Sequence, residues 1–249
     1  MSGHSHWASI KHQKAAADAK KGKVFTKLAR MLMIAARKGS NPDMNFALRY
    51  AISKARAAAM PKDSIEYAIK KGAGELEGQG GLVELLFEGY APGGVAILAE
   101  ALTDNRNRTT SEIRKIWETS GGKMGSSGSV LWMFSRKGLI SVDVNAIPED
   151  NLMEMALEAG ADDVTRSQDV YEVTCSVENF QKVKETLEKA RVPLKTAELT
   201  YLPSTEVSCD AETARKVITL MERLEDHDDI QNVHTNMQMS EEVLAEMKG

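Results

Sequence analysis

The chain has 249 residues, of which 42% are hydrophobic and 27% are charged, and its formal net charge is −4. This length allows two or three compact domains, and the absence of an apolar run of about 18 residues excludes a transmembrane helix. The two cysteines form no CxxC pair and no apolar leader precedes a cleavage site, so the sequence predicts a cytoplasmic protein.

Charge is distributed unevenly along the chain. Residues 1–72 contain 15 lysines and arginines against 4 acidic residues, a net charge of +11. Residues 73–249 contain 17 against 32, a net charge of −15. Such asymmetry is typical of a module that binds a polyanion. The alternative is a solvated helical surface that is rich in lysine.

The basic segment begins with a predicted mobile arm, residues 1–15, and continues as a predicted helix over 16–38. Apolar residues at helical spacing form one face of this helix, and Gly22 indicates a bend. A second stripe runs beside that face and is named here the cationic ridge: Lys20, Lys23, Lys27 and Arg30. The predicted nucleic-acid-binding residues are these four together with Lys11, Lys14 and Lys21.

Two further helices complete a predicted three-helix bundle over residues 1–74. The first is expected to start with Asn41 as its cap and to end at Pro61. The second is expected to start at Asp63 and to stop at Gly72. A glycine-rich stretch then predicts a linker before residue 82.

The acidic part predicts an α+β fold. Residues 82–102 read as a hairpin, 109–120 as a helix, and 129–136 as a strand. The order βαββαβ follows over residues 139–202 and is typical of a ferredoxin-like unit. A last helix and strand are too little to bury a core alone, so they are expected to return to the first sheet. The predicted domains are residues 1–74, a discontinuous domain of 82–136 plus 204–240, and an inserted ferredoxin-like domain of 137–203.

Arg106 and Arg108 form the most distinctive polar feature of the sequence outside the bundle. They precede a helix predicted to have its free N–H groups near Thr110, a setting that attracts phosphate or carboxylate. We therefore predict an anion or partner contact at these two residues. The alternative, equally compatible with the sequence, is a structural cap in which Asp104 pairs with an arginine.

Other candidate sites are weaker. A Gly- and Ser-rich stretch contains Lys123, but Met124 follows it, so a Walker loop is excluded and a turn is expected. The five histidines match no standard ligand signature, and no nucleophile motif is present. The sequence thus predicts no metal, no cofactor and no enzymatic activity. The histidines are His4, His6, His12, His227 and His234.

Five motifs in order resemble the YebC/PmpR family over essentially the whole chain. They are GHSHWASIKHQKAAADAKKGKVFTKLAR, AAAMPKDSIEYAIKKGAG, FEGYAPGGVAILAEALTDNRNRT, GSVLWMFSRKG and LEDHDDIQNVHTN. The resemblance implies a helical N-terminal bundle, two α+β domains and a DNA-binding transcriptional regulator. A mitochondrial branch of translational activators, and bacterial members linked to ribosomes stalled at proline runs, imply an alternative role. The chain departs from the usual family pattern at six positions: His6, Phe46, Ala47, Tyr67, His227 and His234.

The basic bundle and the resemblance together predict a nucleic-acid-binding regulator of gene expression, first of all a DNA-binding transcriptional regulator. A ribosome-associated translation factor that contacts rRNA is the alternative, because a lysine stripe binds either backbone. The sequence has no helix-turn-helix signature and no RNP-type aromatic motif. The acidic α+β domains are expected to meet protein partners. A third hypothesis is a small-anion-binding enzyme centred on Arg106 and Arg108.

Overall fold

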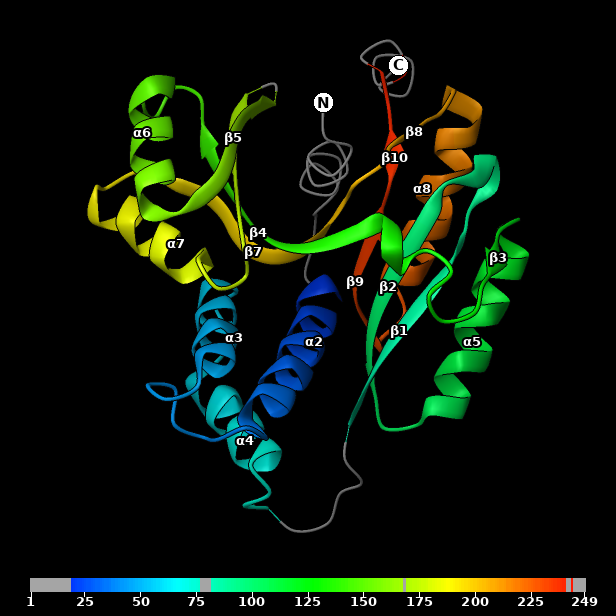
Figure 1. Cartoon of the computed structure of the whole chain (residues 1–249). Helices are drawn as coiled ribbons and strands as arrows, with labels where there is room; N and C mark the ends of the chain where they lie inside the picture. Colours follow the sequence, from blue (N-terminus) through cyan, green and yellow to red (C-terminus); the bar gives the residue numbers. More distant parts are fainter. Residues whose placement is uncertain (1–18, 77–81, 168, 241–242, 244–249) are drawn as a thin grey trace.

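The computed structural model describes residues 19–76, 82–167, 169–240 and 243 (Figure 1). It is an α+β structure in which three helices precede two four-stranded antiparallel sheets, each covered by helices. Among the described residues, no helix combines the length and the apolar character that crossing a membrane requires.

The N-terminal bundle consists of α2 (Ala19–Ala36), α3 (Phe46–Ala57) and α4 (Lys62–Gly72). Its core is formed by the apolar faces of these helices, including the fully buried Leu32 and Leu48. Helix α2 runs through Gly22 without an interruption.

The start of α3 also differs from the sequence prediction. Its cap is Asn45 rather than Asn41, because the Asn45 carboxamide accepts a hydrogen bond from Leu48 N–H and donates to the carbonyls of Ala35 and Gly39. Asn45 therefore ties the start of α3 to the end of α2. Helix α4 likewise starts one position earlier than Asp63, after Pro61.

The first sheet has the strand order β3-β1-β2-β9. Helices α5 and α8 pack on one face, over a core that includes Trp117, Ile97 and Leu220. Strand β9 comes from the C-terminal part of the chain and pairs with β2 through, among others, Leu98 and His234. The elements are β1 (Val83–Tyr90), β2 (Ala96–Thr103), α5 (Arg106–Thr119), β3 (Lys123–Met124), α8 (Ala211–Glu225) and β9 (Ile230–Thr235).

The second sheet has the strand order β5-β6-β4-β7, and all its neighbours are antiparallel. Helices α6 and α7 pack on it over a separate core that includes Phe180, Leu152 and Leu187. The elements are β4 (Phe134–Asp143), α6 (Glu149–Ala159), β5 (Ala161–Ser167), β6 (Val170–Cys175), α7 (Phe180–Lys189) and β7 (Leu194–Pro203). The short strands β8 (Val207–Ser208) and β10 (Met237–Gln238) pair in parallel.

The segment before β4 is not the strand that residues 129–136 predict. It is a turn followed by a 3-10 helix, Leu131–Met133, and β4 begins at Phe134. The cause is Glu88 of β1, whose carboxylate accepts hydrogen bonds from the N–H groups of Gly128, Val130 and Leu131 at 2.6–2.8 Å. Backbone that is bonded to this carboxylate is not free to pair with a strand.

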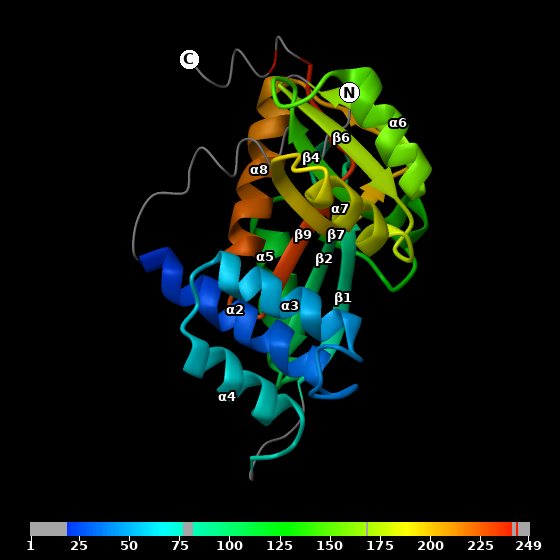
Figure 2. The same ribbon diagram turned by 90° about the vertical axis from the view of Figure 1, so that its left-hand side faces the viewer.

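The long strands β4 and β7 connect the two sheets, and the bundle lies below both of them (Figure 1). The view in Figure 2 shows the lower end of α8 directly above α2. The bundle therefore meets each of the two sheet-containing parts, α3 on one side and α2 on the other.

Candidate nucleic-acid interface

The structure describes three of the predicted nucleic-acid-binding side chains: Lys23, Lys27 and Arg30. Lys20 and Lys21 lie in α2, but their side chains are outside the described set, and Lys11 and Lys14 are outside the described residues. The three described cations occupy one side of α2, as the helical spacing predicts.

These three cations meet the end of α8 and the turn that follows it, residues 225–229, named here the α8 tip. Lys27 Nζ donates to the carbonyl oxygen of Glu225 at 2.7 Å, and Lys23 Nζ donates to that of Asp226 at 3.1 Å. Lys23 also lies 3.5 Å from the Asp226 carboxylate. The guanidinium of Arg30 donates to the carbonyl of Asp228. The last carbonyls of a helix lack intrahelical partners and carry the negative end of its dipole, so cations are favoured there.

Asp229 is the centre of this contact. Its carboxylate is 2% exposed and receives Arg30 at 2.6 Å, Arg108 at 3.0 Å and the Thr109 hydroxyl at 2.6 Å. Its backbone carbonyl accepts from Leu102 N–H at 2.8 Å. Burial alone would raise the pKa of Asp229, but the hydrogen bonds from Thr109 and Arg108 and the charge of Arg30 lower that pKa below its ordinary value. One carboxylate thus joins α2, α5 and the α8 tip.

Asp229 is not among the site residues that the sequence predicts. The signal that could have found it is the run LEDHDD, in which acidic residues directly follow an amphipathic helix. Acidic groups at a helix C-terminus are unfavourable unless cations compensate them. That pattern indicates a basic partner, which is α2 in the folded chain.

The bundle contacts the second sheet differently, through α3. Tyr50 packs edge-on against Phe180, with ring centroids 6.0 Å apart, and its hydroxyl accepts from Leu199 N–H. Lys54 lies 3.2 Å from the Glu198 carboxylate and 5.3 Å from the centroid of the Tyr50 ring. Burial raises the pKa of Tyr50, and the nearby Lys54 opposes that rise. This side of the bundle has an apolar contact that the α2 side lacks among the described cores.

Arg106 and Arg108 lie in different surroundings. Both belong to the first turn of α5, which starts three residues earlier than predicted because Asn105 caps it by accepting from Arg108 N–H. Arg108 pairs with Asp104 at 3.1 Å and with Asp229, which matches the structural alternative. These partners raise the pKa of Arg108 further, the Asp229 hydrogen bond most of all.

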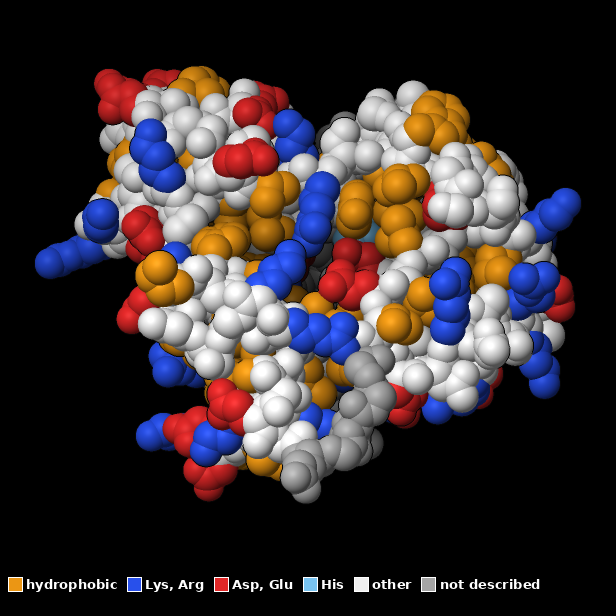
Figure 3. Space-filling view, turned by 60° about the horizontal axis from the view of Figure 1, so that its bottom comes forward, with side chains coloured by type: hydrophobic (Ala, Val, Ile, Leu, Met, Phe, Trp, Pro, Cys, Tyr) orange, Lys and Arg blue, Asp and Glu red, His pale blue; other side chains and the backbone are white. Residues whose placement is uncertain are grey.

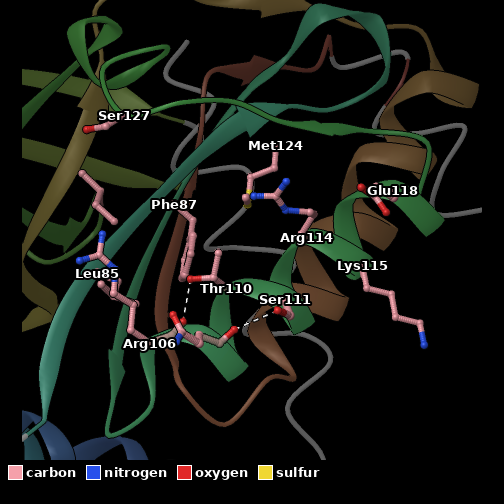
Figure 4. Close-up of a pocket in the computed structure, with 12 residues that line it drawn as sticks. Leu85, Phe87, Arg106, Thr110, Ser111, Arg114, Lys115, Glu118, Met124 and Ser127 are labelled. Carbon is pink, nitrogen blue, oxygen red and sulfur yellow. Dashed lines mark hydrogen bonds between the residues drawn. The ribbon is translucent and has the colours of Figure 1, made fainter.

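Arg106 instead lines an open groove between β1 and α5 (Figure 4). Arg114 and Lys115 lie along the same helix, and the Arg114 guanidinium lies beside Met124. The hydroxyls of Thr110 and Ser111 donate to carbonyls of their own helix at 2.7 and 2.9 Å.

The two described histidines are packed, and the described residues hold no group of three metal-ligating side chains. His234 is buried, its Nε2 lies 3.1 Å from the Glu100 carboxylate, and its Nδ1 lies 3.3 Å from the Thr200 hydroxyl. Burial would raise the pKa of Glu100, but the hydrogen bonds from His234 and Asn232 lower it.

Figure 3 shows acidic side chains beside lysines and arginines in the hollow between the bundle and the two sheets.

Comparison with known proteins gives full-length relatives. A probable transcriptional regulatory protein of Maridesulfovibrio salexigens is 50% identical over 248 residues, covering 100% of both chains. A protein of the same description from Aquifex aeolicus is 49% identical over 249 residues, covering 99% of this chain and 100% of the relative.

A solved structure extends this likeness to the fold. The crystal structure of a conserved hypothetical protein, Aq1575 of Aquifex aeolicus, matches with a TM-score of 0.85 at 49% identity, over 96% of this chain and 99% of that one. Residues 5–75 match the family model of the TACO1/YebC protein N-terminal domain, and residues 82–237 match that of the TACO1/YebC second and third domain. The chain therefore belongs to the TACO1/YebC family, and the two full-length relatives named above are described as probable transcriptional regulatory proteins.

Proposed function

We propose that the chain is a nucleic-acid-binding regulator of gene expression, with DNA as the first candidate target and the cationic ridge of α2 as the contact surface. The observation that carries the proposal is the alignment of Lys23, Lys27 and Arg30 on one side of α2, within a segment of net charge +11. Each of these cations already binds oxygen atoms in the folded chain. Phosphate oxygens of a nucleic-acid backbone are stronger acceptors of the same kind.

The alternative target is RNA, including rRNA within the ribosome. Lysine and arginine contact phosphate in either nucleic acid without specifying bases. Helix α3 packs on the second sheet through Tyr50, so this helix is not free to enter a groove as a recognition helix does. These features favour binding that depends on backbone and shape. Sedimentation of a nuclease-treated lysate would distinguish the two targets, because a ribosomal factor should travel with ribosomal particles after DNA is removed.

The salt dependence of binding tests the ridge directly. Replacing Lys20, Lys23 and Lys27 with Gln should reduce the slope of log affinity against log salt by about 2 to 3 units for duplex DNA, at about 0.9 per phosphate contact. Helicity should survive, because Gln forms helix nearly as well as Lys. Arg30 is left unchanged because it also holds Asp229.

The matched control changes the same number of lysines elsewhere in the bundle. Lys62, Lys70 and Lys71 lie on α4, away from the ridge, and their replacement with Gln removes an equal charge. The proposal expects this variant to keep the slope of the wild type within about one unit. Equal slopes for the ridge variant and the wild type, with both folded, would mean that the ridge contacts no phosphate.

The domain organisation belongs to this proposal as well. We assign residues 1–74 to the nucleic-acid-binding bundle, residues 82–136 with 204–240 to a discontinuous α+β domain, and residues 137–203 to a ferredoxin-like domain inserted in it. The strand order β5-β6-β4-β7 and the separate cores of the two sheets support this assignment. Limited proteolysis should cut in the linker after residue 74 and yield a bundle fragment and a second fragment that contains both α+β domains.

A further inference from the structure

The cationic ridge is occupied by the protein's own α8 tip. Three cations of the ridge meet two kinds of oxygen there: the carbonyls of Glu225, Asp226 and Asp228, and the carboxylates of Asp226 and Asp229. A nucleic-acid backbone would offer the same cations a row of anionic oxygens. Both partners need the same face of α2, so they compete for it.

We propose that the α8 tip is an autoinhibitory latch, which imitates a phosphate backbone and must leave the ridge before nucleic acid binds. The inference rests on the proposed function of the ridge and adds how that ridge is controlled. In the closed arrangement that the structure describes, the side chain of Arg30 is only 19% exposed and Lys27 is partly buried. A duplex therefore has little access to two of the three described ridge cations.

The chemistry of the contact suits a reversible latch. The core beneath α8 includes no described residue of the bundle, and the bundle core includes no described residue of α8. Lys23 and Asp226 remain 50% and 79% exposed, and exposed ion pairs stabilise by little and are screened by salt. Opening this side therefore exposes polar groups to water and leaves both apolar cores intact.

The opposite side of the bundle provides an anchor about which such a movement can occur. Phe46 and Tyr50 of α3 pack against the core of the second sheet, and Lys54 pairs with Glu198. On this side apolar burial adds to the ion pair, whereas the described contacts of the α2 side are ion pairs and hydrogen bonds, among them the nearly buried pair of Arg30 and Asp229. The bundle is thus held through α3 by apolar and polar contacts and through α2 by polar contacts, so the α2 side is the one that opens without exposing an apolar core.

A reversible cross-link tests the latch. Thr26 flanks the ridge on α2 and Asp228 belongs to the tip, and both are exposed. In a Cys209→Ser background, Thr26→Cys and Asp228→Cys are joined by a bifunctional thiosulfonate reagent, whose disulfides a reductant cleaves. Cys175 is buried, and burial raises its thiol pKa to about 11, so it does not compete for the reagent. Affinity for a random-sequence DNA duplex is measured before and after reduction of the same sample.

The locked protein should bind at least about tenfold more weakly than the released protein. The controls are the two single-cysteine variants treated with the same reagent, which should bind equally before and after reduction. Equal binding of the locked and released double variant, with binding still dependent on Lys20, Lys23 and Lys27, would overturn the latch and leave the proposed function standing. If binding changes neither with the cross-link nor with the replacement of Lys20, Lys23 and Lys27, both the latch and the proposed function of the ridge are overturned.

A second variant tests the latch without a cross-link. Asp226→Asn removes the carboxylate that faces Lys23 and should raise affinity about two- to threefold, as expected for loss of one exposed ion pair. Glu154→Gln on α6 changes the net charge by the same amount at an exposed position remote from the ridge. It should leave affinity unchanged. The same increase in both variants would mean that net charge, and not the latch, controls binding.

Discussion

The guanidinium of Arg30 lies 2.6 Å from the carboxylate of Asp229, a residue that belongs to the opposite end of the chain and is 2% exposed. Arg108 approaches the second carboxylate oxygen at 3.0 Å. The buried carboxylate of Asp229 therefore forms ion pairs with two arginines that belong to different helices. This relationship makes one acidic residue responsible for how the bundle, α5 and α8 fit together.

Replacing Asp229 with Asn should lower the free energy of unfolding by about 2 kcal/mol, because the buried hydrogen bonds from Arg108 and Thr109 lose a charged acceptor. Urea denaturation measures the change. The control is Asp150→Asn on α6, whose side chain is exposed and which should stay within about 0.5 kcal/mol of the wild type. If the two variants lose the same amount, Asp229 does not hold this junction.

The pH dependence of stability in the wild type and in Asp229→Asn tests the direction of the pKa shift of Asp229. Because the pKa of Asp229 is lowered in the folded state, its stabilisation is present above the ordinary aspartate pKa of about 3.9 and is lost as the pH falls through the lowered value. The stability difference between the wild type and Asp229→Asn should be constant from about pH 8 to pH 5 and should shrink below about pH 4. A difference that shrinks with rising pH instead would contradict the assigned direction.

Much of the fold follows from local pattern. The three helices of the bundle and most strands of both sheets lie where apolar periodicity and turn residues predict them, because those signals come from the chain's own neighbours. The structure differs from the prediction where contacts between residues far apart in the sequence determine the local conformation. Asn45 caps α3 in place of Asn41 because it also reaches Ala35 and Gly39, and periodicity contains no information about those contacts.

The candidate site shows the same limit more clearly. The sequence predicts that Lys23, Lys27 and Arg30 share one side of a helix, which they do. It does not predict that the carbonyls of Glu225 and Asp226 lie against that side. Every residue has a backbone carbonyl, so neither composition nor charge shows which carbonyls face a given helix. Helical spacing identifies which side chains act together, but the three-dimensional fold determines what they face.

Two glycines of the bundle should respond in opposite ways to the same substitution. A methyl group added at Gly22, inside α2, would meet no atom of another element within 4 Å, so Gly22→Ala should stabilise by up to about 1 kcal/mol through helix propensity. A Cβ at Gly72 would instead fall on the backbone of Met33 in α2. Gly72→Ala should therefore destabilise by about 2 kcal/mol. Thermal melts followed by circular dichroism compare the two, and a gain at both positions would mean that α2 and α4 are not in close contact.

Glu88 offers the sharpest test of how the segment before β4 is held. Its side chain is buried, and the three N–H groups of Gly128, Val130 and Leu131 all donate to its two oxygens. Gln at this position has one acceptor oxygen and places an NH₂ donor against backbone N–H donors, so at least one buried donor loses its partner. We expect Glu88→Gln to lower the free energy of unfolding by about 3 kcal/mol.

The exposed Glu154→Gln on α6 makes the same chemical change and should alter stability by less than about 0.5 kcal/mol. Amide hydrogen exchange adds a local readout that global stability does not supply. In the Glu88 variant, the amides of Gly128, Val130 and Leu131 should exchange faster, while those of β5 and β6 in the second sheet should keep their protection relative to global unfolding. Unchanged exchange at these three amides would show that another group holds the segment.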